Sequence, residues 1–175
     1  NAMDNGAELL TNFEVAHIMK NDSHYTLAAA DGRTVESRFV VNSAGLFSDA
    51  VAAMVGDTSF HVHPRSGEYM ILDKASAGFC DRTIFRTPTA MGKGILVSPT
   101  ADGNILLGPT STDITDKTDK ATTPEGLAKI MEQALEDAPG VPLRSVITSF
   151  TGLRAVGDTG DFIIRFSSER FLTLG

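Results

Sequence analysis

Short apolar runs joined by glycine-containing turns constrain the fold of this chain more than any other feature. The runs 25–30 and 34–43 flank Asp31-Gly32, a dipeptide that two-residue β-hairpins favour. A second pair of apolar runs flanks the turn Thr100–Gly103. Hairpins pair consecutive strands in an antiparallel way, so the sequence predicts a sheet that is mainly antiparallel.

Helical periodicity is confined to two segments. From Leu46 to Gly56 apolar residues recur at helical spacing directly after an apolar run, which predicts a strand, a small-residue turn and a short helix. The second helix is expected to begin with Thr122 or Thr123 as its N-cap and Pro124 in its first turn. Its predicted apolar face, which packs against the sheet, consists of Leu127, Ile130, Met131, Ala134, Leu135 and Ala138.

The other segments read as strands and loops. Residues 60–75 predict two strands interrupted at Pro64 and Gly67, and strands are also expected over 8–20 and in the C-terminal part of the chain. The polar run 111–123 is expected to be a surface loop. The resulting order, roughly βββαββββαβββ, favours an α+β fold with a mainly antiparallel sheet and two helices over a doubly wound fold.

Size and charge exclude several classes of protein. The chain has 175 residues, about the length of one domain, and its net charge of -7 offers no basic surface for nucleic acid. No stretch approaches the ~20 apolar residues of a membrane span. The single cysteine, Cys80, excludes an intramolecular disulfide and fits a reducing, cytoplasmic compartment. Residues 1–3 read as a vector scar, and no secretion signal follows them.

Familiar catalytic motifs are missing from the sequence. It contains no His/Cys cluster at metal-ligand spacing, no nucleophile elbow, no Walker loop, and no G-x-G-x-x-G that opens a helix after a strand. The near match Gly92-Lys93-Gly94 lies between two strand-like runs and is expected to be a turn. Lys93 either reaches a phosphate from that turn or is simply solvated.

Four segments, taken in order, resemble one family. They are VVNSAGLFSDAVA (40–52), HPRSGEYMILDK (63–74), VSPTADGNILLGPTSTD (97–113) and FTGLRAVGDTGDFII (150–164). Together they resemble the FAD-dependent oxidoreductases of the D-amino-acid-oxidase-like superfamily, in the glycerol-3-phosphate dehydrogenase-like branch, and the likeness extends over 8–175. Ala155 departs from the pattern, because many relatives carry proline there, and this leaves the exact branch open.

The resemblance implies a central fragment of a longer, two-domain enzyme. Residues 4–175 would form the substrate-binding (cap) domain, with edge elements of the FAD-binding domain at 8–58 and 162–175, and an apolar strand that stops at Gly175 fits a truncated chain. The parent would use FAD to oxidise glycerol 3-phosphate or, alternatively, a 2-hydroxyacid such as 2-hydroxyglutarate. The fragment alone would lack FAD and activity. The rival interpretation is a stand-alone, non-enzymic ligand-binding module.

The resemblance also assigns candidate site residues. Arg154 would anchor the anionic group of the substrate, because a guanidinium binds carboxylate or phosphate through two hydrogen bonds, and Arg65 would be a second anion ligand. His63 would accept the proton of the alcohol. Each has a structural alternative: a surface ion pair, a sheet-edge arginine, and a histidine without a catalytic partner. Tyr69 would line the pocket or simply pack.

Cofactor contacts are expected elsewhere in the chain. Ser43, Ala44 and Gly45 are small enough to let a flat, charged cofactor approach the backbone, and the N-terminus of the following helix is expected to favour its phosphates. Val15 would contact adenine through its backbone. The expected partners are a small anionic substrate and the missing FAD-binding domain, and nucleic acid is not expected. Formation of a homo-oligomer and peripheral membrane association of the parent are left open.

Overall fold

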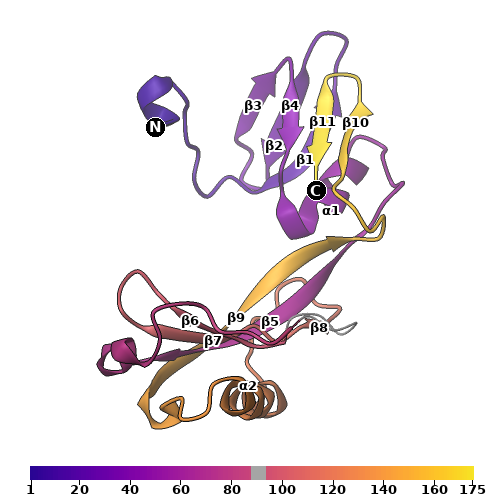
Figure 1. Ribbon diagram of the computed structural model, residues 1–175. Coiled ribbons are helices and arrows are strands. Elements are labelled where there is room, and N and C mark those ends of the chain that lie inside the picture. The colour runs from indigo at the N-terminus through magenta and orange to yellow at the C-terminus, as the bar shows by residue number, and fades with distance from the viewer. Residues whose placement is uncertain (88–93) are drawn as a thin grey trace. The chain divides into compact units, whose positions relative to one another are not determined.

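The computed structural model describes residues 1–87 and 94–175, so the predicted turn at Lys93 lies outside the described residues. The chain forms two compact units, Asn1–Val62 with Gly157–Gly175, and His63–Val156. Most strand pairs in both are antiparallel, and two α-helices are present among the described residues, as the sequence predicted (Figure 1). No helix in this part of the chain is long and apolar enough to cross a lipid bilayer.

The first unit contains two three-stranded sheets. One has the order β1-β2-β3 and confirms the predicted hairpin at Asp31-Gly32, and the other has the order β10-β11-β4. Its elements are the 3-10 turn η1 (Met3–Asn5), β1 (Val15–Lys20), β2 (Tyr25–Ala29), β3 (Thr34–Ser37), β4 (Val40–Asn42), the 3-10 turn η2 (Gly45–Phe47), α1 (Ser48–Ala53), β10 (Ile164–Ser168) and β11 (Phe171–Leu174). The expected strand over 8–20 is wrong before Val15, where the chain is irregular.

The two chain segments of the first unit meet in a parallel strand pair that the sequence did not predict. β11 pairs with β4 in parallel, with Leu172 opposite Val41. The run 34–43 is therefore two strands, because β3 stays with β2 while β4 joins the other sheet. Tyr25 and Phe171 pack edge to face with ring centroids 5.6 Å apart, so residues 146 positions apart in sequence share one core.

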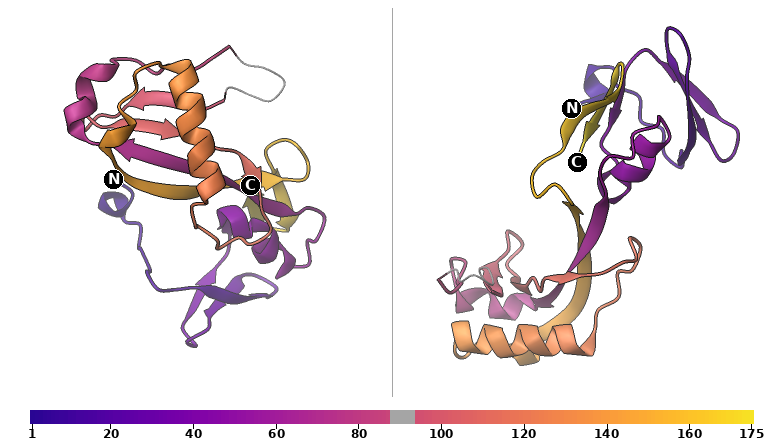
Figure 2. Two further views of the ribbon diagram at one scale, coloured as in Figure 1. Left: turned by 90° about the horizontal axis from the view of Figure 1, so that it is seen from below. Right: turned by 90° about the vertical axis from the view of Figure 1, so that its right-hand side faces the viewer.

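The second unit is one sheet covered by a helix on one face (Figure 2). The sheet has the order β6-β7-β5-β8, and β9 pairs with β5 as well. Its elements are β5 (Val62–Leu72), the 3-10 turn η3 (Lys74–Phe79), β6 (Leu96–Pro99), β7 (Ile105–Gly108), β8 (Thr112–Asp113), α2 (Pro124–Asp137), the 3-10 turn η4 (Leu143–Ser145) and β9 (Val146–Gly157). The core between sheet and helix contains Leu72, Leu107, Ile130 and Ala134.

β5 is a single strand of eleven residues, so the predicted interruption is wrong. Pro64 has no N–H to donate, but its carbonyl accepts a hydrogen bond from the N–H of Ile114 at 3.1 Å. Gly67 is required by close packing, because a Cβ at this position would lie 3.1 Å from the side chain of Pro109. Both residues are thus accommodated within the sheet and do not break it.

Part of the predicted loop 111–123 is also strand. Thr112–Asp113 form β8, and Asp113 lies opposite Arg65 in the antiparallel register. β8 and β7 pair with the same edge of β5, β8 at Arg65 and β7 at Met70, which lies opposite Leu107. The error has a physical cause: two residues of strand within a polar run carry no periodicity that a sequence pattern can show.

α2 begins where it was predicted. Thr123 is the N-cap, and its Oγ1 accepts a hydrogen bond from the N–H of Gly126 at 3.0 Å, with Pro124 as the first helical residue. The predicted apolar face is too wide, since Met131 and Leu135 remain 37% and 45% exposed. A single helix packed on a sheet buries only a narrow stripe of its side chains. Met131 and Leu135 directly follow the buried residues Ile130 and Ala134, so they lie at the margin of this stripe.

Candidate functional site

The two faces of β5 have different surroundings. Alternate residues from Val62 to Leu72 are buried, and those between them are half-buried. Because side chains alternate across a strand and α2 covers one face of the sheet, His63, Arg65, Gly67 and Tyr69 share the opposite face (Figure 2). We call this the open face.

β9 brings further candidates to the open face. The N–H of Asp73 donates to the carbonyl of Ser145 near one end of the two strands, and the N–H of Asp158 donates to that of His61 near the other, so β5 and β9 run antiparallel. The rings of Tyr69 and Phe150 stack with centroids 5.0 Å apart and planes 9° apart.

The stacked pair and the hydrogen bond from Asp158 to His61 indicate the same register between β5 and β9. Stepping two residues at a time from Tyr69 and Phe150 along both strands places Gly67 opposite Gly152, and then Arg65 opposite Arg154. Asp113 lies opposite Arg65 on the other side. A row of Asp113, Arg65 and Arg154 therefore crosses three strands on the open face.

The guanidinium of Arg154 is unpaired within the described part of the chain. Its side chain is exposed, and it makes no hydrogen bond or ion pair with any of the residues 1–87 and 94–175. The structural alternative, a surface ion pair, is thus not observed within the described chain. A guanidinium with five N–H donors on the surface of a sheet is suited to a carboxylate or a phosphate.

Arg65 is held by a carboxylate. Its Nε donates to Oδ1 of Asp113 at 2.6 Å and its Nη2 donates to Oδ2 at 3.1 Å, and these hydrogen bonds lower the pKa of Asp113 and raise that of Arg65. Nε2 of His63 lies 3.7 Å from the same Oδ1. His63, Arg65 and Arg154 are thus brought to one face of one sheet, and Asp113 joins them.

Sequence reasoning missed three residues of this face. Asp113 was assigned to a loop, Phe150 was quoted only within a longer segment, and Gly152 was not singled out. A Cβ at Gly152 would meet no atom within 4 Å, so the space above this position is open between Phe150 and Arg154. The alternation of the segment Phe150-x-Gly-x-Arg could have shown that these three residues share one face.

The candidate cofactor residues lie in the first unit. Ser43, Ala44 and Gly45 form an exposed turn after β4, and Gly45 has a φ of 57°, which favours glycine. The buried side chain of Asn42 holds this turn, since its Oδ1 accepts from the N–H of Ala44 at 3.2 Å and its Nδ2 donates to the carbonyl of Ser48 at 2.8 Å. Small exposed residues on a fixed backbone fit the close approach of a flat cofactor.

The N-terminus of α1, where the sequence suggested that phosphates bind, carries an acidic side chain. The helix has only six residues, and its first turn carries Asp49, whose carboxylate accepts hydrogen bonds from the N–H groups of Ala50 at 2.8 Å and Val62 at 3.0 Å. A negative charge at this end weakens the attraction of the helix for a phosphate, and phosphate binding there stays a prediction. Val15, the other cofactor candidate, is the half-buried first residue of β1, next to a register shift.

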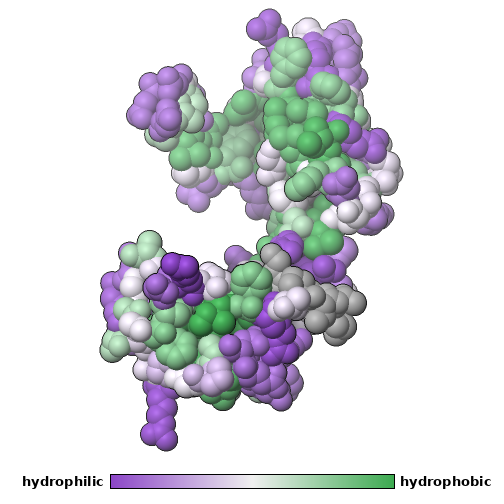
Figure 3. All heavy atoms as spheres, viewed as in Figure 1, coloured by the Kyte–Doolittle hydropathy of each residue, from purple (hydrophilic) through white to green (hydrophobic). Residues whose placement is uncertain are grey.

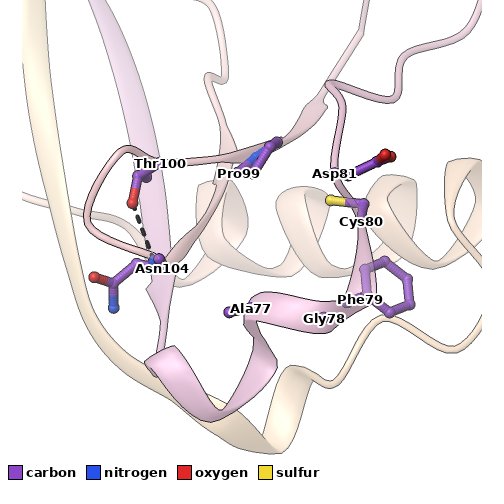
Figure 4. A pocket seen from close by; sticks show the side chains of 9 residues that line it. Ala77, Gly78, Phe79, Cys80, Asp81, Pro99, Thr100 and Asn104 are labelled. Atoms are coloured by element: carbon purple, nitrogen blue, oxygen red, sulfur yellow. Dashed lines mark hydrogen bonds between the residues drawn. The ribbon is translucent and has the colours of Figure 1, made fainter.

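Two shallow pockets lie away from the open-face arginines. One, of about 370 Å³, is lined by the segment from Ala77 to Asp81 and by the turn from Pro99 to Asn104 (Figure 4). Burial is the main cause that raises the pKa of the Cys80 thiol there, with Asp81 adding to it, so Cys80 is a poor nucleophile. The other, of about 260 Å³, is lined by residues that include Glu68 and Thr123.

The sequence of this chain is similar to those of known dehydrogenases. The chain is 41% identical over 164 residues to a glycerol 3-phosphate dehydrogenase of Caloramator mitchellensis, a match that covers 94% of this chain and 34% of that protein. It is 30% identical over 118 residues to the mitochondrial L-2-hydroxyglutarate dehydrogenase of Bos taurus, covering 59% of this chain and 26% of that protein. The chain thus spans less than half the length of either relative.

Structural similarity extends over almost the whole chain. A dithionite-reduced L-alpha-glycerophosphate oxidase from Mycoplasma pneumoniae with FAD bound matches with a TM-score of 0.87 and 28% identity, covering 99% of this chain and 47% of that one. The family model for FAD dependent oxidoreductases, DAO, matches residues 1–175. Together, these matches show that the chain belongs to the DAO family of FAD-dependent oxidoreductases.

Proposed function

We propose that this chain is the substrate side of an FAD-dependent enzyme that oxidises glycerol 3-phosphate. The feature that carries the proposal is the pair of arginines, Arg65 and Arg154, which the register inferred for β5 and β9 brings opposite each other on the open face. A phosphate dianion is matched by two guanidinium groups, and the 41% identical relative is a glycerol 3-phosphate dehydrogenase. Arg154 would bind the anion with its whole guanidinium, and Arg65 with the edge that Asp113 leaves available.

The oxidation itself removes a hydride and a proton. Bound FAD would supply the acceptor for the hydride that leaves the carbon bearing the hydroxyl group. His63 would accept the hydroxyl proton, so that the alcohol becomes a ketone. The aromatic pair Tyr69 and Phe150 would exclude water on the side of the site away from the arginines.

We further propose that the domain division of the longer protein follows the two units. Residues 8–58 and 162–175 would belong to the FAD-binding domain, and the intervening part would be the substrate-binding (cap) domain. The compact units divide at His63 and Gly157, within five residues of these boundaries. Val15, Ser43, Ala44 and Gly45 would then contact FAD from the first unit.

An exposed apolar surface on the first unit supports this division. Val41, Ile164 and Phe166 are 59%, 72% and 68% exposed. The registers place Phe166 opposite Leu172, and Leu172 opposite Val41, so these side chains form a contiguous patch over β10, β11 and β4 (Figure 3). A patch of this kind on a small sheet is expected to be covered in the whole protein, here by further parts of the FAD-binding domain. The cytoplasmic location remains part of the same proposal.

Anaerobic reduction of the flavin tests the proposed substrate. The full-length protein that contains this chain is mixed with glycerol 3-phosphate, and loss of the flavin absorbance near ~450 nm is followed in a stopped-flow instrument. Rapid bleaching by glycerol 3-phosphate, and none by L-2-hydroxyglutarate at the same concentration, is the expected result. The reverse order of rates would assign the protein to the 2-hydroxyacid alternative.

The similarity to an L-2-hydroxyglutarate dehydrogenase supports L-2-hydroxyglutarate as the alternative substrate. A dicarboxylate would also bind to two cations, so the open face alone does not distinguish the two substrates. The bleaching experiment does distinguish them.

The non-enzymic alternative fails if the reading frame upstream of Asp4 encodes a strand followed by a glycine-rich dinucleotide-binding turn. A stop codon directly before this position would favour that alternative.

A further inference from the structure

Asp113 has a position on the open face that no expected role explains. Its two carboxylate oxygens accept hydrogen bonds from Nε and Nη2 of Arg65, and its Oδ1 also lies 3.7 Å from Nε2 of His63. Both partners are candidate substrate residues, and among the described residues no other carboxylate pairs with either side chain. One side chain thus contacts two parts of the candidate site.

The geometry of the ion pair leaves Arg65 able to bind a second anion. Asp113 uses the Nε and Nη2 edge of the guanidinium, and Nη1 makes no hydrogen bond with the described part of the chain. A guanidinium has five N–H donors, so the two on Nη1 and one on Nη2 are still available. Asp113 therefore fixes the plane of the Arg65 side chain without using its full capacity.

Charge gives Asp113 a second effect. Arg65 and Arg154 lie opposite each other on adjacent strands, where like charges repel. The carboxylate of Asp113, in register with Arg65 on its other side, offsets this repulsion. The lowered pKa of Asp113 means that it stays ionised and keeps both effects over the whole neutral range.

We propose that Asp113 is a positioning residue for substrate binding: it holds Arg65 by one edge so that the other edge meets the same substrate anion as Arg154, and it keeps His63 beside them. This inference rests on the proposed function, because it assigns the open face to the substrate. It predicts that Asp113 affects the binding of the anion through Arg65, more than it affects hydride transfer or stability.

Steady-state kinetics of the full-length flavoprotein test the proposal. Asp113→Asn keeps the shape of the side chain but removes its charge, so the KM for glycerol 3-phosphate should rise about fivefold while kcat per bound flavin changes less than about twofold. Asp113→Glu, which retains the charge, should restore part of the affinity. Asp116→Asn is the matched control, because Asp116 lies on the same polar segment and its carboxylate accepts hydrogen bonds from Thr118, with no contact to Arg65 or His63.

A double-mutant cycle shows whether Asp113 acts through Arg65. In an Arg65→Ala background, Asp113→Asn should change KM much less than in the native background. An unchanged KM for folded Asp113→Asn, or an equal effect in both backgrounds, would overturn the proposal. The proposed function fails separately, if the native protein is not reduced by glycerol 3-phosphate at all.

A spectroscopic readout on the 175-residue chain does not need activity. The Nε–H resonance of Arg65 should be sharp and protected from exchange in the native chain, and should broaden in Asp113→Asn but not in Asp116→Asn. A resonance that is equally protected in all three proteins would show that Asp113 does not hold Arg65, and would also overturn the proposal.

Discussion

The carboxylate of Glu68 occupies the space that a side chain at Gly126 would fill. Glu68 is buried beneath the first turn of α2, where its oxygens accept hydrogen bonds from the N–H of Thr123 at 2.8 Å and from its Oγ1 at 2.9 Å. A Cβ at position 126 would clash with this carboxylate. The residue that precedes Tyr69 in β5 thus fastens the helix to the sheet from the face opposite the candidate site.

Gly126→Ala should therefore destabilise the chain although alanine is the better helix former. Displacing the carboxylate weakens charge-assisted hydrogen bonds and overpacks the helix start, at a cost of about 1–3 kcal/mol that exceeds the gain in helix propensity of about 1 kcal/mol. Urea unfolding measures the difference. The same substitution in a Glu68→Ala background should cost much less, and equal costs in both backgrounds would show that the two residues are not coupled.

The stability of the first unit should depend on the ionisation of Asp57. This buried carboxylate accepts a hydrogen bond from the Ser59 hydroxyl at 2.6 Å, which is the largest cause that lowers its pKa, and Nε of Arg165 lies 3.7 Å away. A lowered pKa in the folded state gives stability that is fully present above pH ~4 and is lost as the pH falls further.

Asp57→Asn should lower the melting temperature at pH 7 and reduce its further fall between pH 5 and pH 3, because the group that titrates has been removed. Asp22→Asn is the control, since the Asp22 side chain is exposed and makes no hydrogen bond with the described residues. A fall in acid as steep as that of the native chain would rule Asp57 out as a source of the pH dependence.

Gly152→Ala separates binding from stability at the candidate site. The new methyl group would meet no atom within 4 Å, and Gly152 does not have a left-handed φ, so the melting temperature should stay the same or rise slightly. The methyl would stand between Phe150 and Arg154 where the substrate is proposed to lie, so KM in the full-length protein should rise about tenfold.

Gly78→Ala controls for this effect, because its Cβ would also lie in open space but outside the open face. If Gly152→Ala has native kinetics, the substrate does not occupy the space between Phe150 and Arg154, and the position of the proposed site would have to change.

The 175-residue chain on its own should bind FAD weakly or not at all. Its cofactor candidates supply backbone and small side chains, and the glycine-rich dinucleotide-binding turn is not part of the sequence. The purified chain is expected to be colourless after gel filtration in the presence of FAD. A retained absorbance band near ~450 nm would contradict this prediction.

Local signals in the sequence predicted the local structure of this chain well. The Asp31-Gly32 hairpin and the Thr123 cap of α2 follow from short-range chemistry that requires no knowledge of the fold. Pro64 and Gly67 led to the wrong prediction of an interrupted strand. Proline and glycine often break strands, but they also occur within strands where another segment packs closely. Only the tertiary structure distinguishes these two cases.

Long-range pairings were beyond the reach of the sequence. The resemblance named Arg65, His63 and Arg154, but their position on one face depends on the register between β5 and β9, which are separated by more than 70 residues. Asp113 enters the site only through its pairing with Arg65, and the parallel pair of β4 and β11 likewise joins distant segments. A single sequence carries periodicity within an element and little information about which elements pair.

The kinetics of Arg154→Lys in the full-length flavoprotein test the central claim most directly. Lysine keeps the positive charge but loses the two-pronged geometry, and charge-assisted hydrogen bonds contribute about 1.5–3 kcal/mol, so kcat/KM for glycerol 3-phosphate should fall about tenfold to a hundredfold at unchanged flavin content. Arg144→Lys, an exposed arginine just before β9, should leave it unchanged. Native kinetics in well-folded Arg154→Lys enzyme would contradict the assignment of the open face to the substrate.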